Sequence, residues 1–191
     1  MHRFHRAIAL FSALFSVAIV AACSSNTDLP APTDANIIDT TTMWALNGTA
    51  VTDPSGFSIP DRTAVRTDQS SAFDFVFNID NSGKAVFLPI DLLGLGAVSG
   101  LNPGLYITPT PFDSIKSAVT GDMYVFDDTV NVVVGSSYYA RSRVVCTTLS
   151  VPQYGKIEVL AVDPVERSIT IRYLVNNNCG YLSLELGFPR N

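Results

Sequence analysis

The clearest pattern of hydrophobic and polar positions along the chain is an alternation typical of β-strands. Residues 73–78 alternate so that the rings of Phe73, Phe75 and Phe77 are predicted to share one face of a strand. Asp80-Asn81-Ser82-Gly83 follows with residues favoured in tight turns, and a second apolar stretch comes directly after it. This segment therefore predicts a β-hairpin.

Short strand signals of the same kind recur along most of the chain, separated by clusters of Gly, Pro, Asn and Asp. They cover residues 43–46, 84–88, 123–126, 130–134, 138–147, 157–162, 169–175 and 181–186. Residues 157–175 read as a second hairpin, with 163–167 in its loop. Roughly nine short strands at this spacing predict an all-β fold, an antiparallel β-sandwich or a barrel-like sandwich.

The N-terminus has a different pattern. Arg3 and Arg6 precede an apolar run over residues 7–20, which is shorter than the roughly 20 residues of a membrane-spanning helix. A basic start, an apolar core and small residues are typical of a secretion signal. The tetrad Val20-Ala21-Ala22-Cys23 resembles the lipobox of bacterial lipoproteins, whose cysteine receives diacylglycerol and becomes the first residue after cleavage. The alternative is an ordinary signal with a chance cysteine.

Three regions follow from this organisation. We expect a lipoprotein signal peptide over residues 1–22, with lipidation at Cys23, and a flexible tether over residues 23–38 with a polar, proline-bearing composition. Residues 39–191 then form a single β-sandwich domain, of a size that supports a hydrophobic core. Ser24 stands where an inner-membrane retention signal would carry Asp, which favours the outer membrane of the cell envelope.

Removing the signal changes the composition in a way that restricts the chemistry. His2 and His5 are the chain's two histidines, so none remains after Cys23. Loss of Arg3 and Arg6 leaves 10 basic against 17 acidic residues, a net charge of −7. The acidity argues against a nucleic-acid partner, which selects clustered Lys and Arg.

Without histidine, the usual nucleophilic triads and zinc sites are not available. We expect no catalytic residues, no cofactor and no metal site, with a weak calcium site as an open alternative. A carboxylate-based hydrolase is the remaining enzymatic alternative, but no motif selects a pair of acids. Asp74 is interpreted, with several other aspartates, as a solvated or turn residue.

Two cysteines remain besides Cys23. Cys146 and Cys179 are predicted to form a disulfide, the simplest state for an isolated pair in an oxidising compartment. The alternative is a reduced or metal-binding pair.

The best candidate for a recognition surface is the run Tyr138-Tyr139-Ala140-Arg141-Ser142-Arg143. In a regular strand Tyr139, Arg141 and Arg143 share one face, where they could hold a carboxylate, a sugar or the acidic edge of a partner. The alternative is that the two arginines pair across strands with the abundant acids.

Three features together resemble a wider group of proteins: the hairpin beginning at Phe73, the run Tyr154-Gly155-Lys156-Ile157-Glu158-Val159, and Asn178-Cys179-Gly180-Tyr181 with Cys146. They are similar to β-rich lipoproteins of environmental Gram-negative bacteria of the Gemmatimonas kind, a group with no established activity. The resemblance implies the β-fold and the disulfide, and it implies no substrate.

These observations predict a membrane-anchored envelope lipoprotein with a non-catalytic β-sandwich that binds a ligand, with a protein or glycan as the candidate partner. The alternative is a structural or assembly component of an envelope complex. Oligomeric state and periplasmic or surface orientation are not encoded in a recognisable motif.

Overall fold

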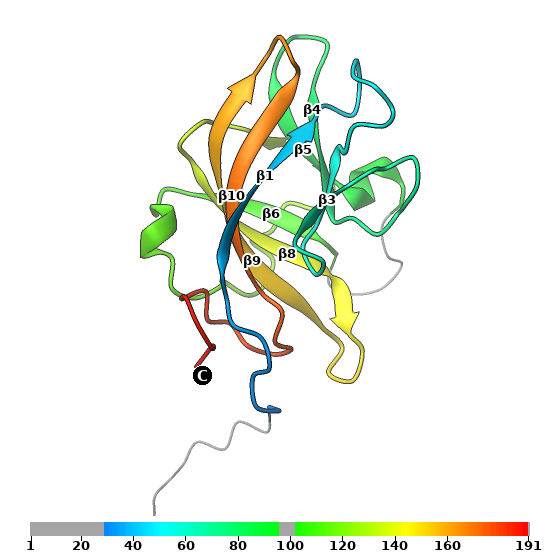
Figure 1. Cartoon of the computed structure of the whole chain (residues 1–191). Helices are drawn as coiled ribbons and strands as arrows, with labels where there is room; N and C mark the ends of the chain where they lie inside the picture. The colour runs from blue at the N-terminus through cyan, green and yellow to red at the C-terminus, as the bar shows by residue number, and fades with distance from the viewer. Residues whose placement is uncertain (1–28, 96–101, 191) are drawn as a thin grey trace, which may run out of the picture.

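The structure, a computed structural model, describes residues 29–95 and 102–190; the signal segment and Cys23 lie outside the described residues. Within these ranges the chain forms two antiparallel five-stranded sheets that pack as a β-sandwich (Figure 1). One sheet has the order β1-β10-β9-β8-β6 and the other β3-β2-β4-β5-β7. The predicted all-β sandwich is therefore confirmed. In the same described ranges, no helix is long and apolar enough to cross a membrane.

The strands of the first sheet are β1 (Ile38–Trp44), β6 (Gly104–Thr108), β8 (Ser137–Cys146), β9 (Val151–Asp163) and β10 (Ser168–Asn176). Those of the second are β2 (Gly56–Ser58), β3 (Thr63–Val65), β4 (Phe75–Ile79), β5 (Ala85–Pro89) and β7 (Val130–Asn131). Two short 3₁₀ turns, η1 (Ile90–Leu93) and η2 (Phe112–Ser114), lie in the connections.

Both predicted hairpins are present, each closed by an aspartate. In the β4–β5 turn the Asp80 carboxylate accepts hydrogen bonds from the backbone N–H groups of Ser82 and Lys84, and Gly83 adopts a φ of 82°. In the β9–β10 turn the Asp163 carboxylate accepts from the N–H groups of Val165 and Glu166. These local hydrogen bonds satisfy backbone N–H groups at the turns, which would otherwise lack an acceptor.

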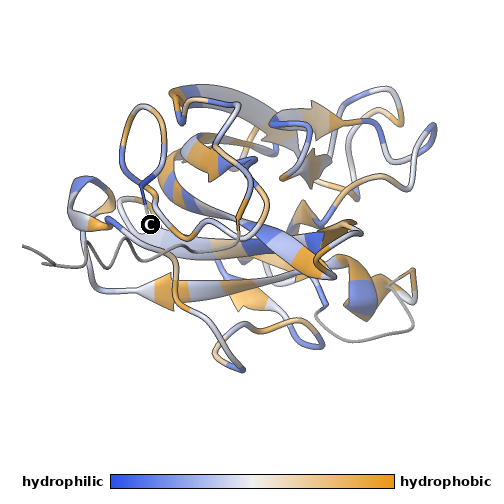
Figure 2. Cartoon of the chain, turned by 90° about the horizontal axis from the view of Figure 1, so that it is seen from below, coloured by the Kyte–Doolittle hydropathy of each residue, from blue (hydrophilic) through white to orange (hydrophobic). Residues whose placement is uncertain are grey.

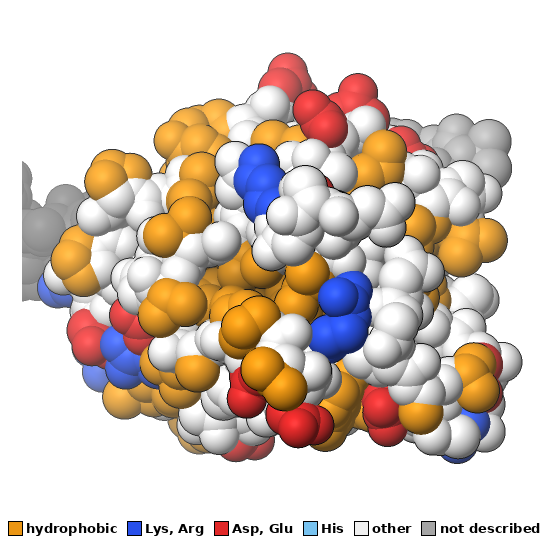
Figure 3. Space-filling view, turned by 90° about the horizontal axis from the view of Figure 1, so that it is seen from above, with side chains coloured by type: hydrophobic (Ala, Val, Ile, Leu, Met, Phe, Trp, Pro, Cys, Tyr) orange, Lys and Arg blue, Asp and Glu red, His pale blue; other side chains and the backbone are white. Residues whose placement is uncertain are grey.

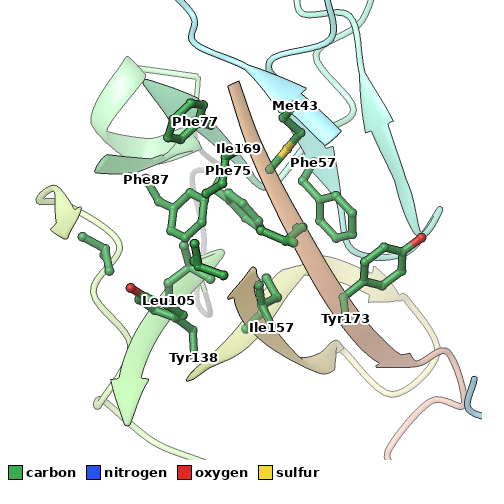
Figure 4. Close-up of a cluster of buried hydrophobic side chains, with 14 of the residues drawn as sticks. Met43, Phe57, Phe75, Phe77, Phe87, Leu105, Tyr138, Ile157, Ile169 and Tyr173 are labelled. Atoms are coloured by element: carbon green, nitrogen blue, oxygen red, sulfur yellow. The ribbon is translucent and has the colours of Figure 1, made fainter. Parts of the chain in front are cut away.

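Aromatic side chains fill the space between the sheets (Figure 4). Phe87 of β5 meets Phe75 edge-on at a ring-centroid distance of 5.1 Å and Tyr138 of the opposite sheet at 5.6 Å. Phe57 meets Tyr173 across the sandwich at 4.9 Å. Edge-to-face contacts at these distances are the favoured arrangement of buried rings, and here they join the two sheets.

Phe73 does not share a face with Phe75 and Phe77, so this part of the sequence prediction is wrong. Phe75 and Phe77 lie in the core between the sheets, whereas Phe73 packs with Val76 and Ile90 in a separate cluster. The physical reason is that β4 begins only at Phe75 and the chain bends at Asp74. The strict alternation of a strand does not extend back across that bend.

A second apolar layer covers part of the outer face of the first sheet. Phe112 and Tyr124 from the connection after β6, and Leu184 from the C-terminal segment, pack there with Tyr154 and Leu174 of β9 and β10. The first sheet is thus buried on both faces in this region.

Cys146 and Cys179 form the predicted disulfide, with a sequence separation of 33 residues and a Cα–Cα distance of 5.6 Å. The bond joins the end of β8 to the segment that follows β10.

Replacing both cysteines by serine should lower the free energy of unfolding by about 3–4 kcal/mol, because the open chain regains the entropy of a loop of this length in the chain-entropy model. Urea unfolding of the oxidised protein and of the double variant gives the difference. The oxidised protein treated with a reductant is the matched control and should behave like the variant. Equal unfolding midpoints for all three samples would contradict the prediction.

Candidate functional site

Tyr139, Arg141 and Arg143, the predicted recognition surface, all lie on β8. In the first half of this strand Tyr138 and Ala140 face the core between the sheets, so that Tyr139 and Arg141 face the outer layer. The β8–β9 register then shifts between Arg141 and Val144. A bulge of this kind re-aims the side chains that follow it.

Arg143 consequently contacts the second sheet instead of continuing the line of Tyr139 and Arg141. The three side chains do not form one exposed stripe, and the predicted shared face is corrected here. An alternation rule applied to the sequence has no means of placing the bulge.

Arg141 is only 4% exposed, and its guanidinium is held by backbone carbonyls. Nε donates to the carbonyl of Asn102 at 2.9 Å and Nη1 to that of Gly121 at 3.0 Å. The guanidinium also lies 4.7 Å from the centre of the Tyr124 ring, within the range of cation–π attraction. Arg141 therefore fastens the loops at 102 and 121 to β8. Neither an exposed recognition role nor pairing with an acid matches this arrangement.

Tyr139 is buried beside it. Its ring stacks on Tyr106 of β6, with ring centroids 6.0 Å apart and an interplanar angle of 11°. The pair closes the outer face of the first sheet at its β6 edge.

The prediction that Asp74 is a solvated or turn residue is wrong. Asp74 is 1% exposed, not solvated. Its two carboxylate oxygens accept backbone N–H groups from Ile59 and Arg143, each at 2.7 Å, and Nη1 of Arg143 lies 3.2 Å from one of them. Burial raises the pKa of the Asp74 carboxyl, while these contacts with Arg143 and Ile59 act in the opposite direction.

Arg143 also points Nη2 toward Asp61, at 3.7 Å, so two carboxylates share this guanidinium. Asp61 is exposed, whereas both oxygens of Asp74 are already engaged by backbone donors. Asp74 and Arg143 are thus arranged to hold strands together. Within residues 29–95 and 102–190, no group of three or more His, Cys, Asp or Glu residues is placed to hold a metal ion.

A second ionic cluster lies on the outer face of β9 and β10. Arg172 donates hydrogen bonds to the carboxylates of Glu158 and Asp113, and its guanidinium lies 4.3 Å from the centre of the Phe112 ring. Lys156, almost fully buried, donates to the carbonyl of Ile115 at 2.8 Å and lies 4.7 Å from the same ring. Burial lowers the pKa of Lys156. These contacts hold η2 against the sheet.

Two open clefts are lined by residues near the beginning and the end of the described chain. Figure 2 looks at the molecule from below, with the C-terminus marked. The two adjoining clefts, of about 650 Å³ and about 490 Å³, share Ser183, Glu185 and Arg190 in their walls. The first is also lined by Leu186 and Phe188, and the second by Leu29, Lys116 and Leu182. The sequence did not predict this site because the second cleft brings Leu29 and Lys116 together with residues 180–190, which are far from them along the chain.

Residues assigned to the tether form part of this region. The Asn178 side chain accepts from the N–H groups of Thr33 and Asp34 and donates to the carbonyl of Asp34. The Tyr181 hydroxyl donates to the carbonyl of Pro30 at 2.9 Å. The tether predicted to reach residue 38 is therefore too long at its C-terminal end, because the segment from Pro30 is fastened to the domain.

Comparison with models of protein families and with curated proteins found no match.

Replacing Arg141 by alanine should lower the free energy of unfolding by about 2–4 kcal/mol, because it leaves the carbonyls of Asn102 and Gly121 without their charged donor and removes buried packing. The control is Arg66→Ala, which breaks the partly exposed pair with Asp68 and should cost less than about 1 kcal/mol. Chemical unfolding measures both. An Arg141→Ala protein as stable as the control would show that this arginine is not an internal fastener.

Proposed function

We propose that this chain is a lipoprotein of the bacterial cell envelope, anchored by acylation of Cys23, whose β-sandwich acts by binding and not by catalysis. The observation that carries the proposal is the tetrad Val20-Ala21-Ala22-Cys23 at the end of a basic and apolar N-terminal segment. Ser24 in the next position favours the outer membrane.

One feature of the described chain supports an extracytoplasmic location. The Cys146–Cys179 disulfide is typical of oxidising compartments such as the periplasm and the cell surface.

The binding role is favoured by the chemistry of the internal clusters. Asp74 and Arg143 join strands, Arg141 holds loops, and Arg172 is paired with two acids. Each of these charged groups is engaged in holding the fold together. The hydrolase alternative would need two carboxylates converging on a substrate from opposite sides, and the pair at Arg143 does not provide that arrangement.

Exposed apolar side chains favour a protein as the partner. They therefore also favour the second candidate function, a structural or assembly role. These side chains lie in the connections and at the strand ends, for example Val51, Val133, Val134, Leu160 and Val165. Figure 3, viewed from the end that carries the β9–β10 turn, shows apolar side chains gathered between charged ones. Exposed apolar patches on a soluble domain mark interaction surfaces.

Cells that express the protein should incorporate a radioactive fatty acid into it, and Cys23→Ser should abolish the label, because the thiol is the acceptor. Ser25→Ala is the matched control, which changes a nearby residue, leaves the Cys23 thiol in place and should retain the label. An unlabelled wild-type protein, or a label that persists in Cys23→Ser, would contradict the proposal.

The same membranes test the binding role. After gentle solubilisation the labelled protein is expected in a complex with a partner. A lone monomer would contradict both the partner-binding role and the assembly role.

A further inference from the structure

An isolated antiparallel β-bridge joins the two ends of the described domain, and we call the two short segments that meet at this bridge the ribbon. Asn36 and Gly187 exchange both backbone hydrogen bonds, at 2.8 Å and 3.0 Å. The Asn36 side chain is buried and donates to the carbonyls of Ser183 and Glu185. The ribbon is thus fixed to the domain through its inward-facing side.

Gly187 adopts a φ of 86°, so the regular alternation of a strand does not extend through it, and the orientation of the side chains beside the bridge is given by their exposure. Three of these side chains are apolar and exposed: Ile37 by 51%, Leu186 by 66% and Phe188 by 62%. We call these three side chains the terminal face. Large apolar side chains gathered in this way on the outside of a ribbon are typical of a contact surface.

The terminal face lies at the end where the chain would leave toward the anchor (Figure 1). Leu29 packs on Gly180, where an added Cβ would lie 2.5 Å from a Leu29 methyl carbon. Between Leu29 and Cys23 there are six residue steps, which span at most about 20 Å. An acylated Cys23 would therefore hold this end close to the lipid surface.

We propose that the terminal face contacts the bilayer that carries the anchor, with Ile37, Leu186 and Phe188 inserted among the lipid headgroups. The inference rests on the proposed acylation of Cys23 and adds an orientation to it. The β9–β10 turn, at the opposite end of the sandwich, then points away from the membrane (Figure 1).

Size favours a lipid surface over a stable protein interface at this face, and charge indicates which kind of lipid contact it makes. Lys116 pairs with Glu185 at 3.8 Å, and Arg190 stands beside them in the cleft walls, so basic and acidic groups are mixed at this border. The chain after Cys23 is acidic. Contact therefore depends on apolar insertion and not on anionic lipid. Three side chains are also few for a stable dimer, which buries on the order of 1,200–2,000 Å².

The test uses the acylated protein reconstituted into phosphatidylcholine vesicles, with or without bromine near the headgroup end of the acyl chains. Phe188→Trp places a fluorescent reporter on the terminal face, and Val165→Trp, whose parent side chain is 85% exposed in the β9–β10 turn, is the matched control. Trp44, at the far end of β1 from Ile38, contributes the same background to both variants. Flotation of the vesicles is measured first.

Brominated lipid should reduce the fluorescence added by Phe188→Trp by about half, since interfacial side chains lie within roughly 5–10 Å of the headgroup–acyl boundary. The fluorescence added by Val165→Trp should stay unchanged, because that turn points away from the bilayer.

The outcomes separate the two proposals. Protein that fails to float with vesicles would overturn the anchor, and this inference with it. A Phe188→Trp protein that floats but is quenched no more than the Val165→Trp control would overturn the terminal face alone. Emission from Phe188→Trp that is blue-shifted but unquenched would show that protein covers the face, and would also overturn the membrane contact.

Discussion

The buried carboxylate of Asp74 is the contact on which the arrangement of the two sheets depends. It stands at the bend before β4 and accepts N–H groups from Ile59, directly after β2, and from Arg143 in the bulge of β8, and these two strands belong to opposite sheets. The Arg143 guanidinium lies against one of its oxygens. A buried carboxylate costs several kcal/mol unless it is paired and hydrogen-bonded, so the position of these strands is coupled to its satisfaction.

The same contact determines which surfaces remain for function. Because the bulge turns Arg143 inward to Asp74, β8 has no continuous basic stripe to offer to a ligand. Arg141 is used on the opposite side to hold loops. The candidate surfaces are consequently at the two ends of the sandwich, where apolar side chains and clefts are exposed. At the terminal end, the disulfide and the amides of Asn36 and Asn178 support the ribbon that presents the terminal face.

The hairpins at Asp80 and Asp163 and the sandwich could be predicted from the sequence, because turn residues and the alternation of strands are local patterns. The disulfide could be predicted because only two cysteines remain after Cys23. The burial of Asp74 could not be predicted from the sequence, because an acid between two phenylalanines has the pattern of a solvated position on a strand. Only the approach of the other sheet makes it a buried acceptor. The composition of residues 29–36 likewise predicts a tether, yet Thr33 is held by a residue 145 positions away. Pairing at that distance leaves no signal in local composition.

The most direct test of the account is the free energy of unfolding of Asp74→Asn, with the exposed Asp127→Asn as the matched control. The amide keeps the size of the carboxylate but replaces one acceptor oxygen by a donor that faces a backbone N–H, and it leaves Arg143 without its buried counter-charge. We expect Asp74→Asn to lose about 2–4 kcal/mol, and the control to remain within about 0.5 kcal/mol of the parent protein. An Asp74→Asn protein as stable as the control would show that the sheets do not depend on this carboxylate.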